Sequence, residues 1–183
     1  MSTKSNAAIE DLYQVPDNGK AEISNGEIVL MSPTGAAPSF ASGEIFASLR
    51  EFSRRTKLGR AVPDNAGFKV NLPHRKSFNP GAAFYTGEDG GMKFFEGAPA
   101  FAAEVRGEND YGPKAEREIA QKIADYFAAG TQAVWDVDLI GRDTVKVFRA
   151  PDPDNPTIYR RGDMAEAEPA VPGWTMPVDD LFE

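Results

Sequence analysis

Glu104 is the acidic residue whose setting most directly suggests chemistry. It lies in the apolar segment 100–106, where period-two alternation places it on the face opposite to Phe101 and Val105. A carboxylate is rarely buried without a partner, so this setting predicts a metal ion or a basic side chain close to it. Two other interpretations stay open. Glu104 could face water at a sheet edge, or it could pair with Arg106.

Lys122 is the second residue of this kind. It shares one stripe of a predicted helix with Ile119, Ile123 and Tyr126. A lysine on an apolar stripe must either extend to water or meet an anion. Pairing with Glu118, one turn earlier, is a further structural alternative. A strand carboxylate followed by a helix lysine is nevertheless the order of groups that metal-dependent phosphodiester cleavage requires.

The composition excludes several other kinds of site. The chain has 183 residues, no cysteine and a single histidine, His74, so thiolate sites, His-rich zinc sites and Ser-His-Asp triads are not available. A net charge of −8 argues against a non-specific DNA coat protein, although it does not exclude a nuclease with a suitable local field. We expect a cytoplasmic protein, because no apolar run is long enough to cross a membrane.

Basic residues gather in the segment 50–60 and again at 74–76. We interpret both groups mainly as a solvated helix face with its flanks. Trp135 and Trp174 are predicted to lie in the core or under a docked tail rather than to stack on a ligand.

The pattern of elements predicts one α/β domain, more strictly an α+β arrangement, with a central mixed sheet and two main helices against it. We expect a single domain over 1–183, with an N-terminal helix and hairpin in 6–35 and an acidic, proline-rich tail in 163–183 packed on the body. Asn25-Gly26 favours a type I′ hairpin turn. The expected helices cover 6–13, 39–57 and 113–129; the expected strands cover 20–24, 27–31, 58–63, 67–72, 82–86, 100–106, 133–137, 144–148 and 157–161.

Over residues 10–182 the chain resembles the Uma-two family of restriction-endonuclease-like proteins, within the PD-(D/E)xK nuclease superfamily. No single motif is specific, but the order and spacing of several segments are. The segments that carry the resemblance are 25–35, 67–70, 79–84, 102–106, 122–130 and 134–138.

The resemblance implies a restriction-endonuclease-like core with a divalent-metal site. Glu104 then corresponds to the strand acid that is both catalytic and a metal ligand, and Lys122 to the catalytic lysine. Glu44 on the preceding helix is a weaker match to a further acidic ligand. The family's Pro-Asp pair falls on Pro80-Gly81, so Gly81 stands where the metal-binding aspartate is expected.

Two hypotheses follow. The first is a DNA endonuclease that uses Mg²⁺ or Mn²⁺ when active, and is weakened or inactive because of Gly81. Glu44, or an acid of the glycine-rich loop (Glu88 or Asp89), could then replace the missing ligand. The second is a catalytically dead, nuclease-fold protein that binds a partner, forms a homodimer and needs no cofactor.

Overall fold

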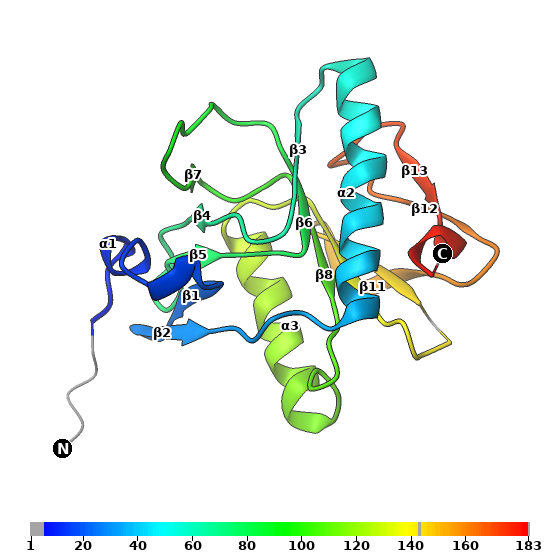
Figure 1. The fold of residues 1–183 in the computed structure, drawn as a ribbon. Coiled ribbons are helices and arrows are strands. Elements are labelled where there is room, and N and C mark those ends of the chain that lie inside the picture. Colours follow the sequence, from blue (N-terminus) through cyan, green and yellow to red (C-terminus); the bar gives the residue numbers. More distant parts are fainter. Residues whose placement is uncertain (1–5, 143, 183) are drawn as a thin grey trace.

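A six-stranded mixed sheet forms the centre of the molecule in the computed structural model, which describes residues 6–142 and 144–182 (Figure 1). The predicted bounds of 1–183 therefore include residues 1–5, 143 and 183, which lie outside the described part. β8 and β9 are parallel and the other neighbouring strands are antiparallel, which confirms the mixed sheet. In spatial order the strands are β11 (Asp152–Tyr159), β10 (Val145–Arg149), β9 (Ala133–Val137), β8 (Phe101–Val105), β6 (Ala82–Tyr85) and β3 (Arg60–Val62).

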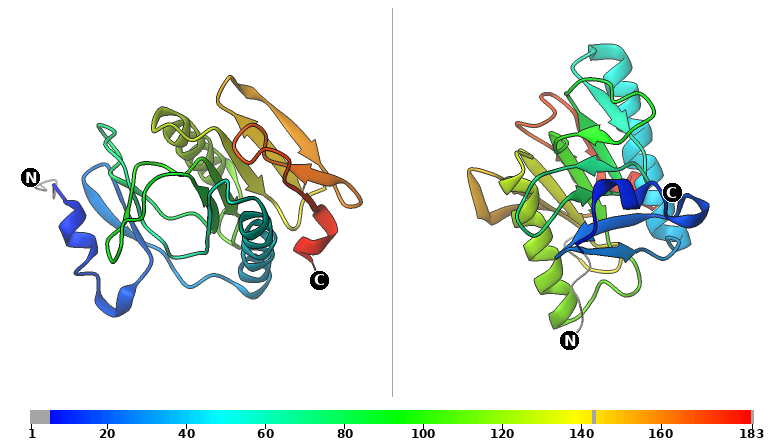
Figure 2. Two further views of the ribbon diagram at one scale, coloured as in Figure 1. Left: turned by 90° about the horizontal axis from the view of Figure 1, so that it is seen from above. Right: turned by 90° about the vertical axis from the view of Figure 1, so that its left-hand side faces the viewer.

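The two long helices cover opposite faces of this sheet, as Figure 2 shows. α2 (Ala36–Thr56) begins three residues earlier than predicted and packs Ile45 and Leu49 against one face. α3 (Pro113–Ala128) packs Ile123 and Tyr126 against the other face. Pro113 occupies the first turn of α3, as predicted, where its missing N–H costs no hydrogen bond.

The N-terminal hairpin has the predicted turn. β1 (Ala21–Ser24) pairs with β2 (Glu27–Leu30), and Asn25 and Gly26 have φ angles of 53° and 78°, as a type I′ turn requires. The predicted helix over 6–13 is shorter, because only α1 (Ile9–Leu12) is α-helical and a single 3-10 turn, η1 (Pro16–Asn18), follows it. β1 is also tied to the body, since Ile23 N donates a hydrogen bond of 2.9 Å to Ser77 Oγ.

A small second sheet lies beside the hairpin and was only partly predicted. Its strands are β5 (Ser77–Phe78), β4 (Phe68–Lys69) and β7 (Phe95–Glu96). The predicted strand over 67–72 is reduced to the two residues of β4. β7 lies in the glycine-rich loop, where the sequence predicted no strand. It is held by the stacking of Phe95 on Phe68, whose ring centroids are 5.0 Å apart.

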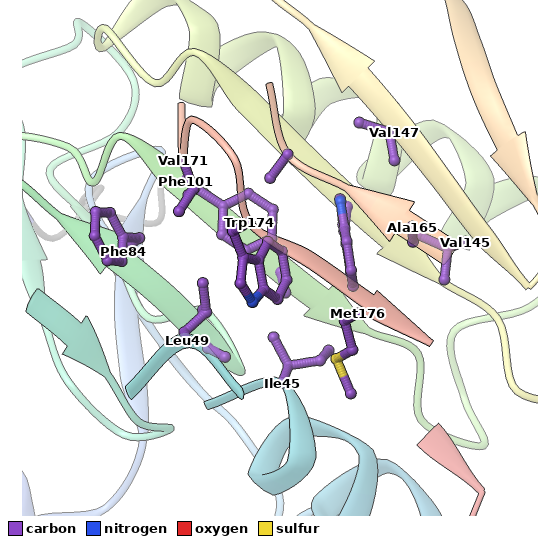
Figure 3. Close-up of a cluster of buried hydrophobic side chains, with 14 of the residues drawn as sticks. Ile45, Leu49, Phe84, Phe101, Val145, Val147, Ala165, Val171, Trp174 and Met176 are labelled. Atoms are coloured by element: carbon purple, nitrogen blue, oxygen red, sulfur yellow. The ribbon is translucent and has the colours of Figure 1, made fainter. Parts of the chain in front are cut away.

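The segment after β11 completes the core on the α2 face. It contains β12 (Met164–Glu166), β13 (Thr175–Pro177) and η2 (Val178–Leu181). Trp174 stacks on Trp135 with ring centroids 5.0 Å apart, and its Nε1 donates a hydrogen bond of 3.0 Å to Ser48 Oγ on α2. Figure 3 shows Trp174 in the same buried cluster as Leu49 and Phe101. Both tryptophans are buried, as the sequence indicated.

β11 is longer than the edge strand predicted over 157–161. It contains Pro153 and Pro156, which disfavour a strand in sequence-based prediction. They are tolerated because β11 lies at the edge of the central sheet. Among the described residues, no helix has both the length and the apolar character that crossing a membrane requires.

Candidate active site

Glu104 and Lys122 meet on the α3 side of the central sheet. The Lys122 ammonium lies 2.9 Å from Glu104 Oε1 and also 2.9 Å from Oε1 of a second carboxylate, Glu22. β8, α3 and β1 supply these three residues. The strand acid and the helix lysine that were identified from the sequence are thus in contact in the fold.

The alternative interpretations of these two residues are wrong. Glu104 is not at an edge, because β8 lies between β6 and β9. Arg106 binds Asp136 and Glu116 rather than Glu104. Glu118 lies 3.6 Å from Lys114 and forms no ion pair with Lys122 among the described residues.

Tyr126 holds the Glu104 carboxylate from α3. Its hydroxyl donates a hydrogen bond of 2.6 Å to Glu104 Oε1, and its ring stacks on Phe78 at a centroid distance of 3.9 Å. Burial raises the pKa of the Tyr126 hydroxyl well above its ordinary value, and the charges of Glu104 and Glu22 raise it further. The hydroxyl therefore keeps its proton and acts as a donor to Glu104.

Glu22 is the site residue that sequence reasoning missed. It is 4% exposed, and its Oε1 accepts a hydrogen bond of 2.7 Å from Asn79 N while its Oε2 lies 2.9 Å from Arg75 Nη1. Burial alone would raise the pKa of this carboxyl group, but Lys122 and Arg75 outweigh that effect and lower it. The available signal was the one that identified Glu104, a lone acid between apolar strand residues.

Arg75 connects Glu22 to a second buried carboxylate, Asp125 on α3. Its Nε donates a hydrogen bond of 2.7 Å to Asp125 Oδ2, and His74 Nε2 lies 2.7 Å from Asp125 Oδ1. Burial would raise the pKa of Asp125, but hydrogen bonds from Arg75, His74 and Gln121 lower it. The interpretation of Arg75 as part of a solvated basic face is therefore wrong, because its side chain is buried between two carboxylates.

Lys122 is a permanent cation in this arrangement. Burial would lower the pKa of its ammonium group, but the charges of Glu104 and Glu22 and their hydrogen bonds raise it above its ordinary value. At neutral pH the side chain therefore carries a proton. It is suited to orient or neutralise an anion, and unsuited to remove a proton from water.

Gly81 lies directly before β6 and contacts the other helix. Its N–H donates a hydrogen bond of 3.0 Å to Ala103 O, although Ala103 already pairs with Ala82. A Cβ atom placed on Gly81 would lie only 2.7 Å from Ser42 Oγ of α2. A side chain at position 81 would thus start towards α2, whereas the Glu104 carboxylate lies against α3.

The other acids named from the sequence do not join the site. Glu44 is half-buried on α2, two residues after Ser42. Asp89 is exposed and lies 3.0 Å from Arg60 Nη2, and Glu88 is exposed in the same loop. Within the described part of the chain, no three Asp, Glu or His side chains are grouped as ligands for one metal ion.

The donor set of Glu22 and Glu104 does not fit a divalent ion as it is arranged. Mg²⁺ is usually held by one or two carboxylates with near-octahedral geometry, so their number would suffice. Both oxygens of Glu22 and Oε1 of Glu104 already accept hydrogen bonds or ion pairs. A metal ion would have to displace Lys122 before it could use both carboxylates.

The architecture places the molecule among the nuclease-like α/β folds. It is similar to the crystal structure of a "putative nuclease belonging to DUF820" from Anabaena variabilis ATCC 29413, with a TM-score of 0.74. The two share 17% sequence identity, and the match covers 96% of this chain and 97% of the other, so the similarity is one of fold. No match was found among curated proteins.

The sequence pattern of the Uma2 family, described as "Putative restriction endonuclease", matches residues 9–179. The chain belongs to this family, which confirms the resemblance noted from its motifs.

Proposed function

We propose that this protein has the fold and the catalytic residues of a DNA endonuclease, and that the native chain cleaves DNA weakly or not at all. The observation that carries the proposal is the contact of Lys122 with both Glu104 and Glu22, together with the absence of a side chain at position 81. Family membership and fold support the nuclease part of the proposal. The charge balance of the site supports the loss of activity.

That charge balance is nearly complete without a metal ion. Glu22 and Glu104 carry two negative charges; Lys122 lies against both of them, and Arg75, which also pairs with Asp125, lies against Glu22. A divalent cation gains little from carboxylates whose charge is already neutralised at hydrogen-bond distance. An aspartate at position 81 would add a negative charge, but its Cβ starts towards α2, so its carboxylate would have to turn past the start of β6 to reach Glu104 on the α3 side.

Glu104 and Lys122 are the residues to which we assign the chemistry of an active form. Glu104 is the strand carboxylate that would hold Mg²⁺ or Mn²⁺. Lys122, as a cation, would offset the negative charge of a phosphodiester rather than serve as a base. Tyr126 would fix the orientation of Glu104 through its hydrogen bond.

Restoring the aspartate requires a second change, because its Cβ would press on Ser42 Oγ. We would therefore compare the native chain, Gly81→Asp, Ser42→Gly and the double variant in a supercoiled-plasmid assay with Mg²⁺ or Mn²⁺. We expect the double variant to cleave at least about tenfold faster than the native chain, because groups that support a metal site typically change activity by about tenfold or more. Ser42→Gly alone is the matched control and should stay as slow as the native chain.

A further Glu104→Gln change in the double variant should abolish cleavage if Glu104 holds the metal. Cleavage by the native chain at the rate of the double variant would contradict the proposal. It would mean that another acid already supplies the missing ligand.

A second candidate, a nuclease-fold protein that binds a partner without catalysis, is favoured by one observation. Three of the four oxygens of Glu22 and Glu104 already have partners, as in a structural ion-pair network. Silence of all four chains in the plasmid assay, with each shown to be folded, would favour this candidate.

A further inference from the structure

A cleft of about 410 Å³ lies at the end of the central sheet where β9 finishes, lined by the loop after β9, by Arg160 and Arg161, and by Phe182 after η2. Three arginines line it, Arg142, Arg160 and Arg161, together with the ring of Phe182. None of its described lining residues is acidic. In a chain with a net charge of −8, such a lining is a local feature and does not reflect the general charge of the protein. We call it the arginine cleft.

The wall of the arginine cleft is fixed to the strand end that carries the candidate active site. Asp138 Oδ1 accepts hydrogen bonds from Ile140 N (3.1 Å) and Gly141 N (2.8 Å), which hold the loop after β9. It also accepts a hydrogen bond of 2.9 Å from the hydroxyl of Tyr111, in the segment after β8. Burial would raise the pKa of Asp138, but these donors lower it. The Asp138 carboxylate therefore stabilises the loop after β9.

The acids around the arginine cleft are engaged in local structure. Asp179 accepts hydrogen bonds from Arg161 Nε and from Gly162 N, the latter at 3.1 Å. Asp163 Oδ2 accepts a hydrogen bond of 2.8 Å from the backbone N–H of Arg160. Two further acids, Asp143 and Glu183, neighbour the lining in sequence and lie outside the described residues.

Arg161 and Phe182 form a platform at the cleft. The guanidinium carbon of Arg161 lies 4.2 Å from the centroid of the Phe182 ring, a stacking distance. Among the described contacts, Arg161 uses its Nε for Asp179, and no contact is made by its terminal nitrogens. Arg142 is exposed and has no hydrogen bond or ion pair to the described residues. Planar guanidinium groups beside an aromatic ring are the combination with which proteins bind single-stranded nucleic acid.

We infer that the arginine cleft binds a phosphate group of a DNA strand, with Arg142 and Arg161 contacting phosphate oxygens and Phe182 supporting a base. The inference rests on DNA as the substrate class of the proposed function. To the proposed function it adds a second contact with the DNA strand, away from the position of cleavage. The cleft and Glu104 share the end of the sheet at which the parallel strands β8 and β9 finish.

Binding is tested without metal, so that cleavage plays no part. Fluorescence anisotropy with a labelled single strand of about 20 nucleotides, in EDTA, gives Kd at several salt concentrations between about 50 and 200 mM. We expect Arg142→Ala to weaken binding about threefold or more, and to reduce the slope of log K against log salt by about one. Arg161→Ala should act in the same direction, although it also removes the contact with Asp179.

Arg54→Ala is the matched control, because Arg54 is an exposed arginine in the last turn of α2 that does not line the cleft. It should leave both Kd and slope unchanged. Thermal unfolding of each variant checks that the fold is intact. Competition by inorganic phosphate alone at millimolar concentration would show a site for the free ion and would overturn the assignment to a strand.

The inference is also overturned if the native chain does not bind the strand at low salt, or if Arg54→Ala weakens binding as much as Arg142→Ala. These outcomes are separable from failure of the proposed function. A protein that never cleaves plasmid can still show the Arg142 effect, and a variant that cleaves can lack it.

Discussion

Two ionic networks lie two residues apart in the sequence, one around Glu104 in β8 and one around Arg106, the residue that follows β8. Both contact α3, since Lys122 and Glu116 belong to that helix. They differ in the cation at their centre. One uses the flexible ammonium of a lysine, and the other uses the planar fork of an arginine.

The Arg106 network is saturated. Arg106 Nε and Nη2 each donate a hydrogen bond of 2.7 Å to Asp136, one to each carboxylate oxygen. Nη1 and Nη2 also bind the two oxygens of Glu116, with the second contact at 3.1 Å. The hydrogen bonds that Arg106 donates to Asp136 raise the pKa of Arg106 above its ordinary value, although burial opposes them. Such a network fixes geometry and offers nothing to a ligand.

The Glu104 network is incomplete by comparison. Lys122 divides its charge between Glu104 and Glu22, and Glu104 Oε2 has no donor among the described residues. The Glu104 side chain is 24% exposed, whereas those of Arg106 and Asp136 are 4% and 3% exposed. The difference separates a network that holds the fold from one that could still accept a ligand.

The largest effect is expected from breaking the saturated network. Arg106→Ala would leave the buried Asp136 without its cation and should lower the free energy of unfolding by about 3–5 kcal/mol. Chemical denaturation measures this loss. Lys114→Ala, which removes an exposed pair with Glu118, should change it by less than about 0.5 kcal/mol. A loss below about 1 kcal/mol for Arg106→Ala would remove the distinction between the two networks.

Replacing the shared lysine tests the other network. Lys122→Met should lower the free energy of unfolding by about 2–3 kcal/mol, because Glu22 and Glu104 would lose the cation between them and only Arg75 would remain against Glu22. The same change should free both carboxylates for a divalent ion. We therefore expect Mn²⁺ to raise the Tm of the variant and to leave that of the native chain unchanged. Equal shifts in both proteins would show that Lys122 does not block the ion.

Acid should weaken the Glu22–Arg75–Asp125 part of the site. The folded-state pKa values of Glu22 and Asp125 lie below their ordinary values of 4.5 and 3.8, so the unfolded chain binds more protons in this range. Their contribution to stability is complete above about pH 5 and is lost as the pH falls below these values. Glu22→Gln should flatten the decline in unfolding free energy between about pH 5 and 3, measured by urea titration. A decline as steep as that of the native chain would assign the acid sensitivity to other carboxylates.

The smallest effect is expected from Tyr126→Phe. This change removes the hydrogen bond to Glu104 but keeps the ring that stacks on Phe78, and should cost about 1 kcal/mol. A double-mutant cycle with Glu104→Gln isolates the interaction. Additive losses would show that Tyr126 does not hold the carboxylate.

Local patterns were sufficient to predict the main elements. Period-two alternation identified β8, and the i, i+3, i+4 stripe identified α3. Asn25-Gly26 predicted the hairpin turn. The two-residue strands β4, β5 and β7 were not predictable with their true bounds, because so short a strand is fixed by its neighbours in the fold and not by its own sequence.

The site was predictable only where the local context was unusual. Glu104 and Lys122 were identified because each is a charged residue among apolar ones. Glu22 and Arg75 are 53 residues apart, and nothing in the local sequence joins them. The position of Ser42 against Gly81 likewise depends on how α2 docks. Such partners come from tertiary packing, which periodicity does not encode.

The docking of the last segment on α2 has a consequence for how the chain is made. Trp174 and its hydrogen-bond partner Ser48 are separated by 126 residues, and Leu181 belongs to the same buried cluster as Ile45. During synthesis, the apolar face of α2 that packs against these later residues stays uncovered until they leave the ribosome. Contacts this distant in sequence form late and slowly, so this part of the apolar surface is exposed to aggregation during synthesis.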